Sequence, residues 1–363
     1  MYKKLYNIIP VLGLLVSLLS SCDRTIHEYP EPMDAEVVIE TSVDRSPPLY
    51  YKEVVYNQKW ERTVHDLERV ATPAYRPAEG YAMRLILDIY RCKQIGDTRS
   101  MRQDERVSRH VMELDKDALP PQHRLHTRLP DGNYCVLGWA DYVHKGETKD
   151  VFYATPSLLN TLFNFQNYPA DTHLKNCAAS KQGFSLDHNL GPEGYPILPG
   201  IGMQHSRIIP LMLKRPVARY TLVASDYSNF LKEGGRLRGG KIKVTYRQYV
   251  SIGYDVSQQE PNEFISGYTF ETSLPDDLPQ DTKEIILMKD YVFTSLNKED
   301  NIIVDLCFYD ANGVEISRCS NVEIPLLRNH ETVVKAPFLS KKVDNGGKVT
   351  IDEKFDGEHI VKI

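Results

Sequence analysis

The chain has 363 residues, 44 lysines and arginines against 49 aspartates and glutamates, and a formal net charge of −5. This length favours two domains over one, and 41% hydrophobic with 26% charged residues is an ordinary globular composition. Such a charge balance provides no basic field to attract a phosphate backbone, so we expect no nucleic-acid partner.

The first 22 residues have the organisation of a secretory signal. Lys3 and Lys4 precede an apolar run at residues 8–19, which is shorter than the roughly 20 residues of a membrane-spanning helix. The run ends in LSSC, which resembles the lipobox of bacterial lipoproteins. The resemblance implies cleavage between Ser21 and Cys22 and attachment of a lipid to the Cys22 thiol. The alternatives are an ordinary signal peptide with a chance cysteine, or a buried cysteine.

We therefore expect residues 1–21 to be a signal peptide and residues 22–35 a lipidated tether. The tether, CDRTIHEYPEPMDA, is polar and carries two prolines, as extended linkers do. Acyl chains contribute roughly 0.8 kcal/mol per buried CH₂, so two or three chains hold a protein firmly at a membrane. The expected location is the cell outer membrane, with the folded part facing outward.

Alternating apolar and polar residues dominate the rest of the chain and predict strands with one face on a core. The clearest alternation lies at residues 81–91, 241–250 and 301–310. Further strands are expected at residues 36–44, 133–143, 219–225, 285–294 and 347–352. The sequences LPDGNY at 129–134 and DANG at 310–313 predict hairpin turns.

Helical signals are few and short. Residues 155–165 begin with a Thr155 cap and a proline, which predicts a short helix. Residues 225–235 predict two helical turns that end at a pair of glycines. The predicted fold class is all-β, with minor short helices.

A segment rich in glycine and proline, residues 187–200, interrupts both periodicities. We predict the domain boundary there. The expected organisation is an N-terminal β-sandwich domain at residues 36–200 and a C-terminal β-sandwich domain at residues 201–363.

One motif superficially resembles a phosphate-binding loop. Gly235, Gly240 and Lys241 have its spacing, but Ile242 stands where Ser or Thr must hold magnesium. The expected helix precedes the loop and the strand follows it, which is the reverse of the required order. We interpret the segment as an ordinary helix-to-strand loop.

The eleven histidines show no convincing metal spacing. His123 and His126 are three residues apart in a proline-flanked segment that we interpret as a surface loop. Asp187, His188 and His205 lie near the predicted boundary and receive no role. We expect no metal, no cofactor and no catalytic residue, with carboxylates paired from distant parts of the chain as the open alternative.

Five cysteines follow Cys22, at positions 92, 135, 177, 307 and 319. Cys307 and Cys319 flank the DANG turn, but a regular hairpin places them on opposite faces, so a disulfide between them needs a bulge. We favour buried free thiols over that disulfide.

Three longer segments resemble the fimbrillin-like lipoproteins of Bacteroidetes. They are DGNYCVLGWADYVHKGETKDVFY at 131–153, LKRPVARYTLVASD at 213–226 and VEIPLLRNHETVVKAPFLS at 322–340. They match the family's W-A-D-Y core, its R-P-x-A strand start and its P-L-x-R-N-H-x-T signature, and depart from it at Ala336-Pro337, where glycine is commoner. The resemblance implies two tandem transthyretin-like, Greek-key β-sandwiches, a place in a type V-like fimbria, and no catalysis.

The residues of the signature are interpreted as structural. Pro325 suits an edge strand or the first residue of a strand, because it cannot donate to a ladder. Arg328 and His330 are expected to hydrogen-bond turn backbone.

The family resemblance also poses a question about Arg45. A polymerising subunit of the family loses its lipidated first strand to an Arg-specific protease, and the opened groove accepts a neighbour's strand. Arg45 follows the first expected strand and is the candidate maturation cleavage site. The alternative is an ordinary charged loop residue, in which case the lipid is kept and the protein is an anchor. The expected partners are the membrane and other fimbrial subunits, by donor-strand exchange.

Our main hypothesis is thus a lipid-anchored anchor or accessory subunit of a fimbria. A surface carbohydrate-binding lipoprotein is the alternative, because the chain has 22 tyrosines, which suit binding surfaces. Trp60 and Trp139 are its first candidate residues. A hydrolase with dispersed carboxylates is the third hypothesis.

Overall fold

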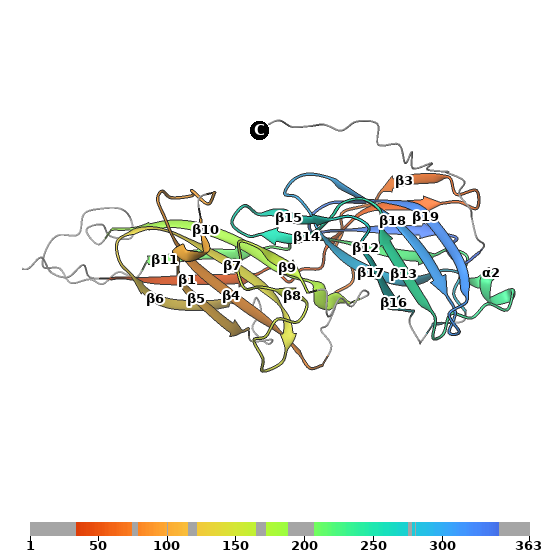
Figure 1. Cartoon of the computed structure of the whole chain (residues 1–363), viewed down its shortest axis with the longest axis horizontal. Coiled ribbons are helices and arrows are strands. Elements are labelled where there is room, and N and C mark those ends of the chain that lie inside the picture. The colour runs from red at the N-terminus through yellow and green to blue at the C-terminus, as the bar shows by residue number, and fades with distance from the viewer. Residues whose placement is uncertain are drawn as a thin grey trace, which may run out of the picture.

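The alternating segments form strands in both halves of the chain, as predicted. The computed structural model describes residues 34–74, 79–99, 101–114, 122–164, 172–187, 207–274, 278–279 and 281–340. Its strands form five sheets, arranged as two elongated lobes that meet end to end (Figure 1). The fold class is all-β, and the α-helix within these ranges, α2 at Tyr227–Lys232, has six residues.

Several predictions fall outside the described residues. They are the signal peptide at 1–21, the cleavage and lipid site at Ser21 and Cys22, most of the tether, His188, His205, the boundary near residue 200 and the strand at 347–352. All of these stay predictions.

The first lobe consists of two sheets that share one core. Its strands are β1 (Ala35–Val43), β4 (Tyr81–Cys92), β5 (Arg106–Glu113), β6 (Gln122–Leu129), β7 (Gly132–His144), β10 (Ala178–Leu186) and β11 (Arg207–Leu213). One sheet has the order β11-β1-β6 and the other β10-β7-β4-β5. A Cβ on Gly138 of β7 would lie 2.8 Å from the Leu211 side chain of β11. Glycine at this position therefore lets the two sheets approach closely.

The second lobe is built in the same way. Its strands are β2 (Leu49–Tyr56), β3 (Arg62–Asp66), β12 (Val217–Ala224), β13 (Lys241–Tyr246), β16 (Thr269–Ser273), β17 (Ile285–Phe293), β18 (Asp300–Tyr309), β19 (Glu315–Leu326) and β20 (His330–Ala336). One sheet has the order β17-β12-β20-β2-β3, the other β16-β13-β18-β19. Buried side chains from both sheets form the second core.

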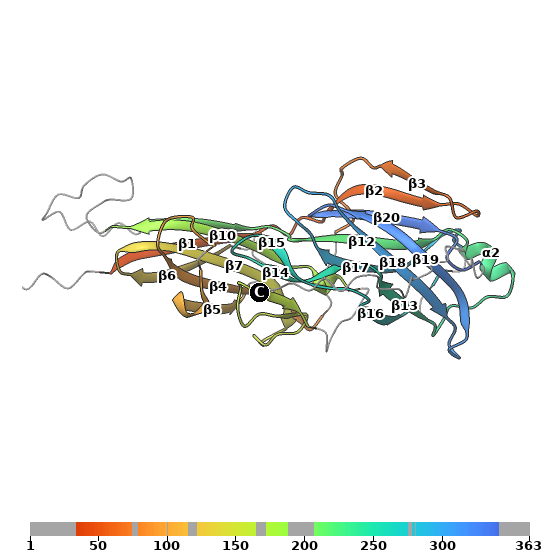
Figure 2. The same ribbon diagram turned by 45° about the horizontal axis from the view of Figure 1, so that its top comes forward.

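Strand pairing interleaves the two halves of the chain, which Figure 2 makes visible through the orange β2 and β3 beside the blue β20. β2 lies parallel to β20, with Leu49 opposite His330, although β1 belongs to the other lobe. β11 lies parallel to β1, with Val37 opposite Arg207. The predicted division at residue 200 is thus crossed by pairing at residues 49–55 and 207–213.

A fifth sheet connects the lobes. Its order is β15-β14-β9-β8, where β8 (Tyr153–Ala154) and β9 (Thr161–Phe163) precede the predicted boundary, and β14 (Val250–Asp255) and β15 (Glu260–Ile265) follow it. Gly253 of β14 lies opposite Leu162 of β9. Backbone hydrogen bonding therefore joins the two halves of the chain at this point.

Some local predictions were wrong. The expected helix at 155–165 is a loop followed by β9, because pairing with β14 overrides a weak helical signal. The expected strand at 241–250 is β13 and the start of β14, which belong to different sheets. His123 and His126 lie on β6 rather than in a loop, paired with Thr41 and Val38 of β1.

The two turn predictions had different outcomes. The DANG turn joins β18 and β19 as a hairpin, as predicted. The turn at 129–134 instead joins strands of different sheets, since β6 pairs with β1 while β7 pairs with β10 and β4. The Tyr134 hydroxyl donates to the Pro130 carbonyl at 2.8 Å and so fixes this corner.

The helix predicted at 225–235 and the free cysteines were confirmed. Helix α2 ends before Gly234, whose φ of +85° suits glycine. The five cysteines of the described residues are free, and all but Cys92 are buried. Cys307 lies opposite Arg318 and Cys319 opposite Leu306. Burial raises the pKa of Cys135 and of Cys177 to about 12, so these thiols stay protonated at neutral pH.

Candidate functional site at the junction of the lobes

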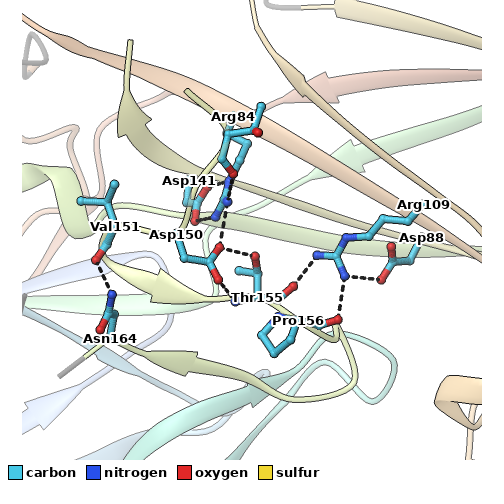
Figure 3. A network of polar contacts seen from close by, with 10 residues as sticks. Arg84, Asp88, Arg109, Asp141, Asp150, Val151, Thr155, Pro156 and Asn164 are labelled. Atoms are coloured by element: carbon cyan, nitrogen blue, oxygen red, sulfur yellow. Dashed lines mark hydrogen bonds and ion pairs between the residues drawn. The ribbon is translucent and has the colours of Figure 1, made fainter. Parts of the chain in front are cut away.

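The loop that carries β8 and β9 is anchored by a buried ion pair of the first lobe (Figure 3). Arg84 of β4 donates from Nε to Asp141 Oδ1 at 2.9 Å and from Nη2 to Asp141 Oδ2 at 2.7 Å. Its Nη1 donates to Asp150 Oδ1 at 2.8 Å and to the Thr148 carbonyl at 2.7 Å. Asp141, the aspartate of the W-A-D-Y motif, therefore holds the guanidinium that fixes residues 148–150.

The same loop is held at two further points (Figure 3). The Thr155 amide and hydroxyl donate to Asp150 at 2.9 and 2.7 Å. Arg109 of β5 donates to the Pro156 carbonyl at 2.8 Å and approaches the buried Asp88 at 3.6 Å. These contacts position β8 and β9 for pairing with β14 across the junction.

Burial and charge act in opposite directions on this ion pair. Burial favours a lower pKa for Arg84, but hydrogen bonds and charge from Asp141 outweigh it, and the pKa of Arg84 is raised. Burial also raises the pKa of Asp141, against the opposing hydrogen bonds and charge of Arg84. Each charge of this buried pair therefore depends on its partner for compensation.

A second buried arginine, Arg215, connects three parts of the chain. Its Nε donates to Asn176 Oδ1 at 2.6 Å, its Nη2 to the Ser46 carbonyl at 2.8 Å, and its Nη1 to Asn329 Oδ1. Arg328 donates to the Arg215 carbonyl at 3.0 Å, which confirms that this signature residue binds backbone. Arg215 has only 3% of its surface exposed, and among the described residues no carboxylate lies within ion-pair distance of it.

Lys175 forms the third polar link between the lobes. It lies in the short 3-10 helix η3 (His173–Lys175), and its Nζ contacts Asp290 of β17. Both side chains are buried, and the Tyr246 hydroxyl donates to Asp290 Oδ2 at 3.1 Å. A buried pair of this kind fixes the relative position of two elements, because either charge alone is costly to bury.

Arg219 of β12 joins this cluster from the second lobe. It contacts Glu331 through Nη2, donates to Thr72 at 2.9 Å, and lies 3.2 Å from His173 Nδ1 through Nη1. Burial and the charges of Arg219 and Lys289 lower the pKa of His173 to about 3. His173 is therefore neutral at physiological pH, and its Nδ1 can accept from Arg219.

A cavity of about 190 Å³ opens where these groups meet. Its wall includes Arg45, Arg215, Arg219, His173, Asn176 and Tyr291, and no aspartate or glutamate is among the lining residues. The cavity therefore combines positive charge with aromatic surface.

Arg45, the candidate cleavage residue, contributes its side chain to this cavity. The backbone on both sides of it is held in place. Asp44 donates its amide to the Leu213 carbonyl at 3.0 Å, Ser46 donates its amide to Asp44 Oδ1 at 2.9 Å, and the Ser46 carbonyl accepts from Arg215. Arg45 itself is half-buried.

The two tryptophans proposed for carbohydrate binding differ in burial. Trp139 is fully buried. Trp60 is partly buried and packs on Tyr56 and Phe338, with ring centroids 5.1 and 6.2 Å away. Trp139 therefore offers no ring to solvent and Trp60 only part of one, whereas Tyr249 is 72% exposed.

The remaining candidate motifs lie away from the junction. The glycine-rich segment at 235–241 follows α2 and precedes β13, which confirms a helix-to-strand loop. Within the described ranges, His, Cys, Asp and Glu nowhere gather in threes that could hold a metal. Nor do these ranges contain a helix of the length and apolarity that a membrane span requires.

Sequence reasoning assigned no role to Arg84, Arg215 or Arg219. The available signals were the motifs themselves, since Arg215 and Arg219 stand in the RPVAR sequence and Asp141 in WADY. A buried charge inside a strongly apolar strand is the general signal for such residues.

Fold and junction together define an all-β protein of two interleaved β-sandwich lobes, fixed to each other by buried charges. The chain belongs to a family of unknown function (DUF6562), whose sequence profile matches residues 50–363. No curated protein matches the sequence.

Several solved structures are similar to this chain over most of its length. A candidate adhesin from Bacteroides ovatus has 12% identity over 79% of this chain and 76% of that chain, with a TM-score of 0.39. The fimbrial anchor protein Mfa2 from Porphyromonas gingivalis has 11% identity over 79% and 82%, with a TM-score of 0.36. A candidate polysaccharide-binding protein from Bacteroides thetaiotaomicron has 9% identity over 79% and 80%, with a TM-score of 0.40.

Proposed function

We propose that this protein is a non-catalytic, lipid-anchored subunit of a surface fimbria that keeps its first strand and acts as an anchor or accessory subunit. Cys22 carries the lipid, and the β-rich body faces outward from the outer membrane. The fixed backbone around Arg45 is the observation that favours an uncut anchor or accessory subunit over a cleaved, polymerising subunit.

A protease must draw several residues on both sides of the scissile bond into an extended conformation. At Arg45 this requires the loss of the Asp44–Leu213 and Arg215–Ser46 hydrogen bonds. Pro47 and Pro48 follow directly and restrict the conformations that the segment can adopt. These features support retention of the bond after Arg45.

The position of β1 supports the same role. β1 is the central strand of its sheet, antiparallel to β6 on one edge and parallel to β11 on the other. Val37 and Ile39 of β1 are fully buried in the core of the first lobe. Loss of β1 would leave two unpaired strand edges and open a groove in that core. A chain that keeps β1 offers no such acceptor groove to a neighbour.

Intact-mass analysis of protein extracted from membranes tests the proposal directly. We expect a mature chain that starts at acylated Cys22 and continues through Arg45. Arg45→Gln should leave the mass unchanged apart from the substitution and should leave the amount of protein at the cell surface unchanged. A mature N-terminus at Ser46 in the wild-type protein would overturn the anchor role.

Limited proteolysis with trypsin provides a matched comparison on the folded chain. Arg102 is 75% exposed in its side chain, whereas Arg45 is half-buried with held flanks. We expect cleavage after Arg102 well before cleavage after Arg45, because local opening must precede the second cut. Cleavage first at Arg45 would contradict the argument from the fixed backbone.

A further inference from the structure

We propose that the cavity between the lobes binds a compact organic oxyanion, a carboxylate or sulfate group such as an acidic sugar carries. The proposal rests on the geometry of the junction alone and does not depend on the fimbrial role.

The first argument is uncompensated charge. Three guanidinium groups, those of Arg45, Arg215 and Arg219, line the cavity. Arg219 is paired with Glu331, but Arg215 donates to neutral oxygens only, and within the described ranges Arg45 forms no ion pair. Burying cationic groups without carboxylates is costly, and an anion in the cavity would offset that cost.

The second argument is the presence of spare donors. The Nε atoms of Arg45 and of Arg219 are buried and have no hydrogen-bond partner among the residues described. Arg219 is 97% buried. A buried donor without an acceptor is costly, and guanidinium groups match the two oxygens of a carboxylate or the oxygens of a sulfate.

The third argument is the shape and chemistry of the remaining wall. The volume of about 190 Å³ is several times the share of about 30 Å³ that one water occupies in the liquid. Tyr81, Tyr142 and Tyr291 supply aromatic surface, and Asn176 also lines the cavity. Aromatic walls beside fixed cations suit an anion with an organic body better than a bare inorganic ion.

Isothermal titration calorimetry of the full chain in detergent, at constant ionic strength, tests the site. The probes are glucuronate, inorganic sulfate and, as the neutral control, glucose. We expect saturable binding of glucuronate and none of glucose. Binding of sulfate without glucuronate would overturn the organic occupant and leave the site to an inorganic ion.

Matched arginine variants assign the binding to the cavity. Arg45→Gln should weaken glucuronate or sulfate binding at least tenfold. Arg45→Lys should weaken it less, because lysine keeps the positive charge but lacks the planar guanidinium. Arg102→Gln, at an exposed arginine outside the cavity, should leave binding unchanged. Thermal melting of each variant verifies that it is folded.

Three further results would overturn the proposal. They are the absence of binding by both anions, equal binding of glucose and glucuronate, and equal weakening by Arg45→Gln and Arg102→Gln.

Discussion

Two buried arginines of this protein, Arg84 in the first lobe and Arg215 at the junction, occupy opposite electrostatic situations. Arg84 lies between Asp141 and Asp150 and donates to both of them. Arg215 is equally inaccessible, yet its hydrogen bonds go to two asparagine side chains and one carbonyl. The first site compensates its guanidinium with two carboxylates, whereas the second keeps a net positive charge beside a cavity.

The difference in charge compensation separates a structural role, at Arg84, from a proposed ligand-binding role, at Arg215. A compensated guanidinium needs nothing further, so the Arg84 network serves only to hold the loop of β8 and β9. A guanidinium bonded to neutral oxygens is satisfied as a donor but not as a charge. The junction can therefore gain from a ligand, while the network of the first lobe cannot.

The largest expected effect comes from removing the compensation of Arg84. Asp141→Asn keeps the shape of the side chain but leaves a buried guanidinium beside a neutral amide. We expect a loss of about 3–5 kcal/mol in the free energy of unfolding, measured by urea denaturation. Asp104→Asn, at a carboxylate whose side chain is 71% exposed, is the control and should change stability by less than about 0.5 kcal/mol. Equal effects at both positions would contradict the assignment of a buried ion pair.

Replacing Arg215 should cost less than replacing Asp141. Arg215→Gln removes a charge that no nearby carboxylate compensates, but leaves some of the acceptors Asn176, Asn329 and Ser46 without a donor. We expect a loss of about 1–3 kcal/mol in the same denaturation experiment. A loss as large as that of Asp141→Asn would erase the distinction between the two sites.

The next effect is a pH dependence at the junction. The pKa of His173 is about 3 in the folded chain and about 6.5 in an unfolded one. Below pH 6.5 the unfolded chain binds a proton that the folded chain does not, so stability falls as the pH falls from 6.5 towards 3. The slope from this group is at most about 1.4 kcal/mol per pH unit.

The measurement is urea denaturation between pH 6.5 and 5.5, above the range in which most carboxylates titrate. His173→Gln should flatten the dependence in this window. An unchanged slope in the variant would show that another group is responsible.

The smallest effect is expected at an exposed ion pair of the first lobe. Arg124 lies 2.8 Å from Glu40, with 65% of the arginine side chain exposed. Arg124→Gln should cost less than about 1 kcal/mol, because solvent screens such pairs, and raising the salt concentration should reduce even this loss. A cost comparable to that of Asp141→Asn would mean that exposure does not separate these pairs.

Much of the fold could be predicted from sequence because period-two alternation is a local property. The strands around residues 36–44, 81–91, 133–143 and 285–294 were found within one or two residues of their observed bounds. Residues 161–163 were missed, because three residues carry too little periodicity and depend on a partner strand, in which Gly253 lies 91 positions after Leu162. Pairing between distant parallel strands, such as β2 with β20, has no local signal at all.

The candidate site was less predictable. Arg45 was identified by its place after the first strand, but sequence alone did not show that it lines the same cavity as Arg215 and Arg219. Arg215 and Arg219 stand in the RPVAR motif, but no role was assigned to them from the sequence. The cavity depends on how segments from both lobes converge, and no short pattern contains that information.

The placement of β2 has a consequence for how the chain reaches its final form. Leu49 lies opposite His330, 281 positions later in the chain. During synthesis β2 must therefore wait for β20, with its apolar face unprotected meanwhile. Such long-range closure slows folding and favours aggregation, so this protein is expected to need a chaperone while it folds.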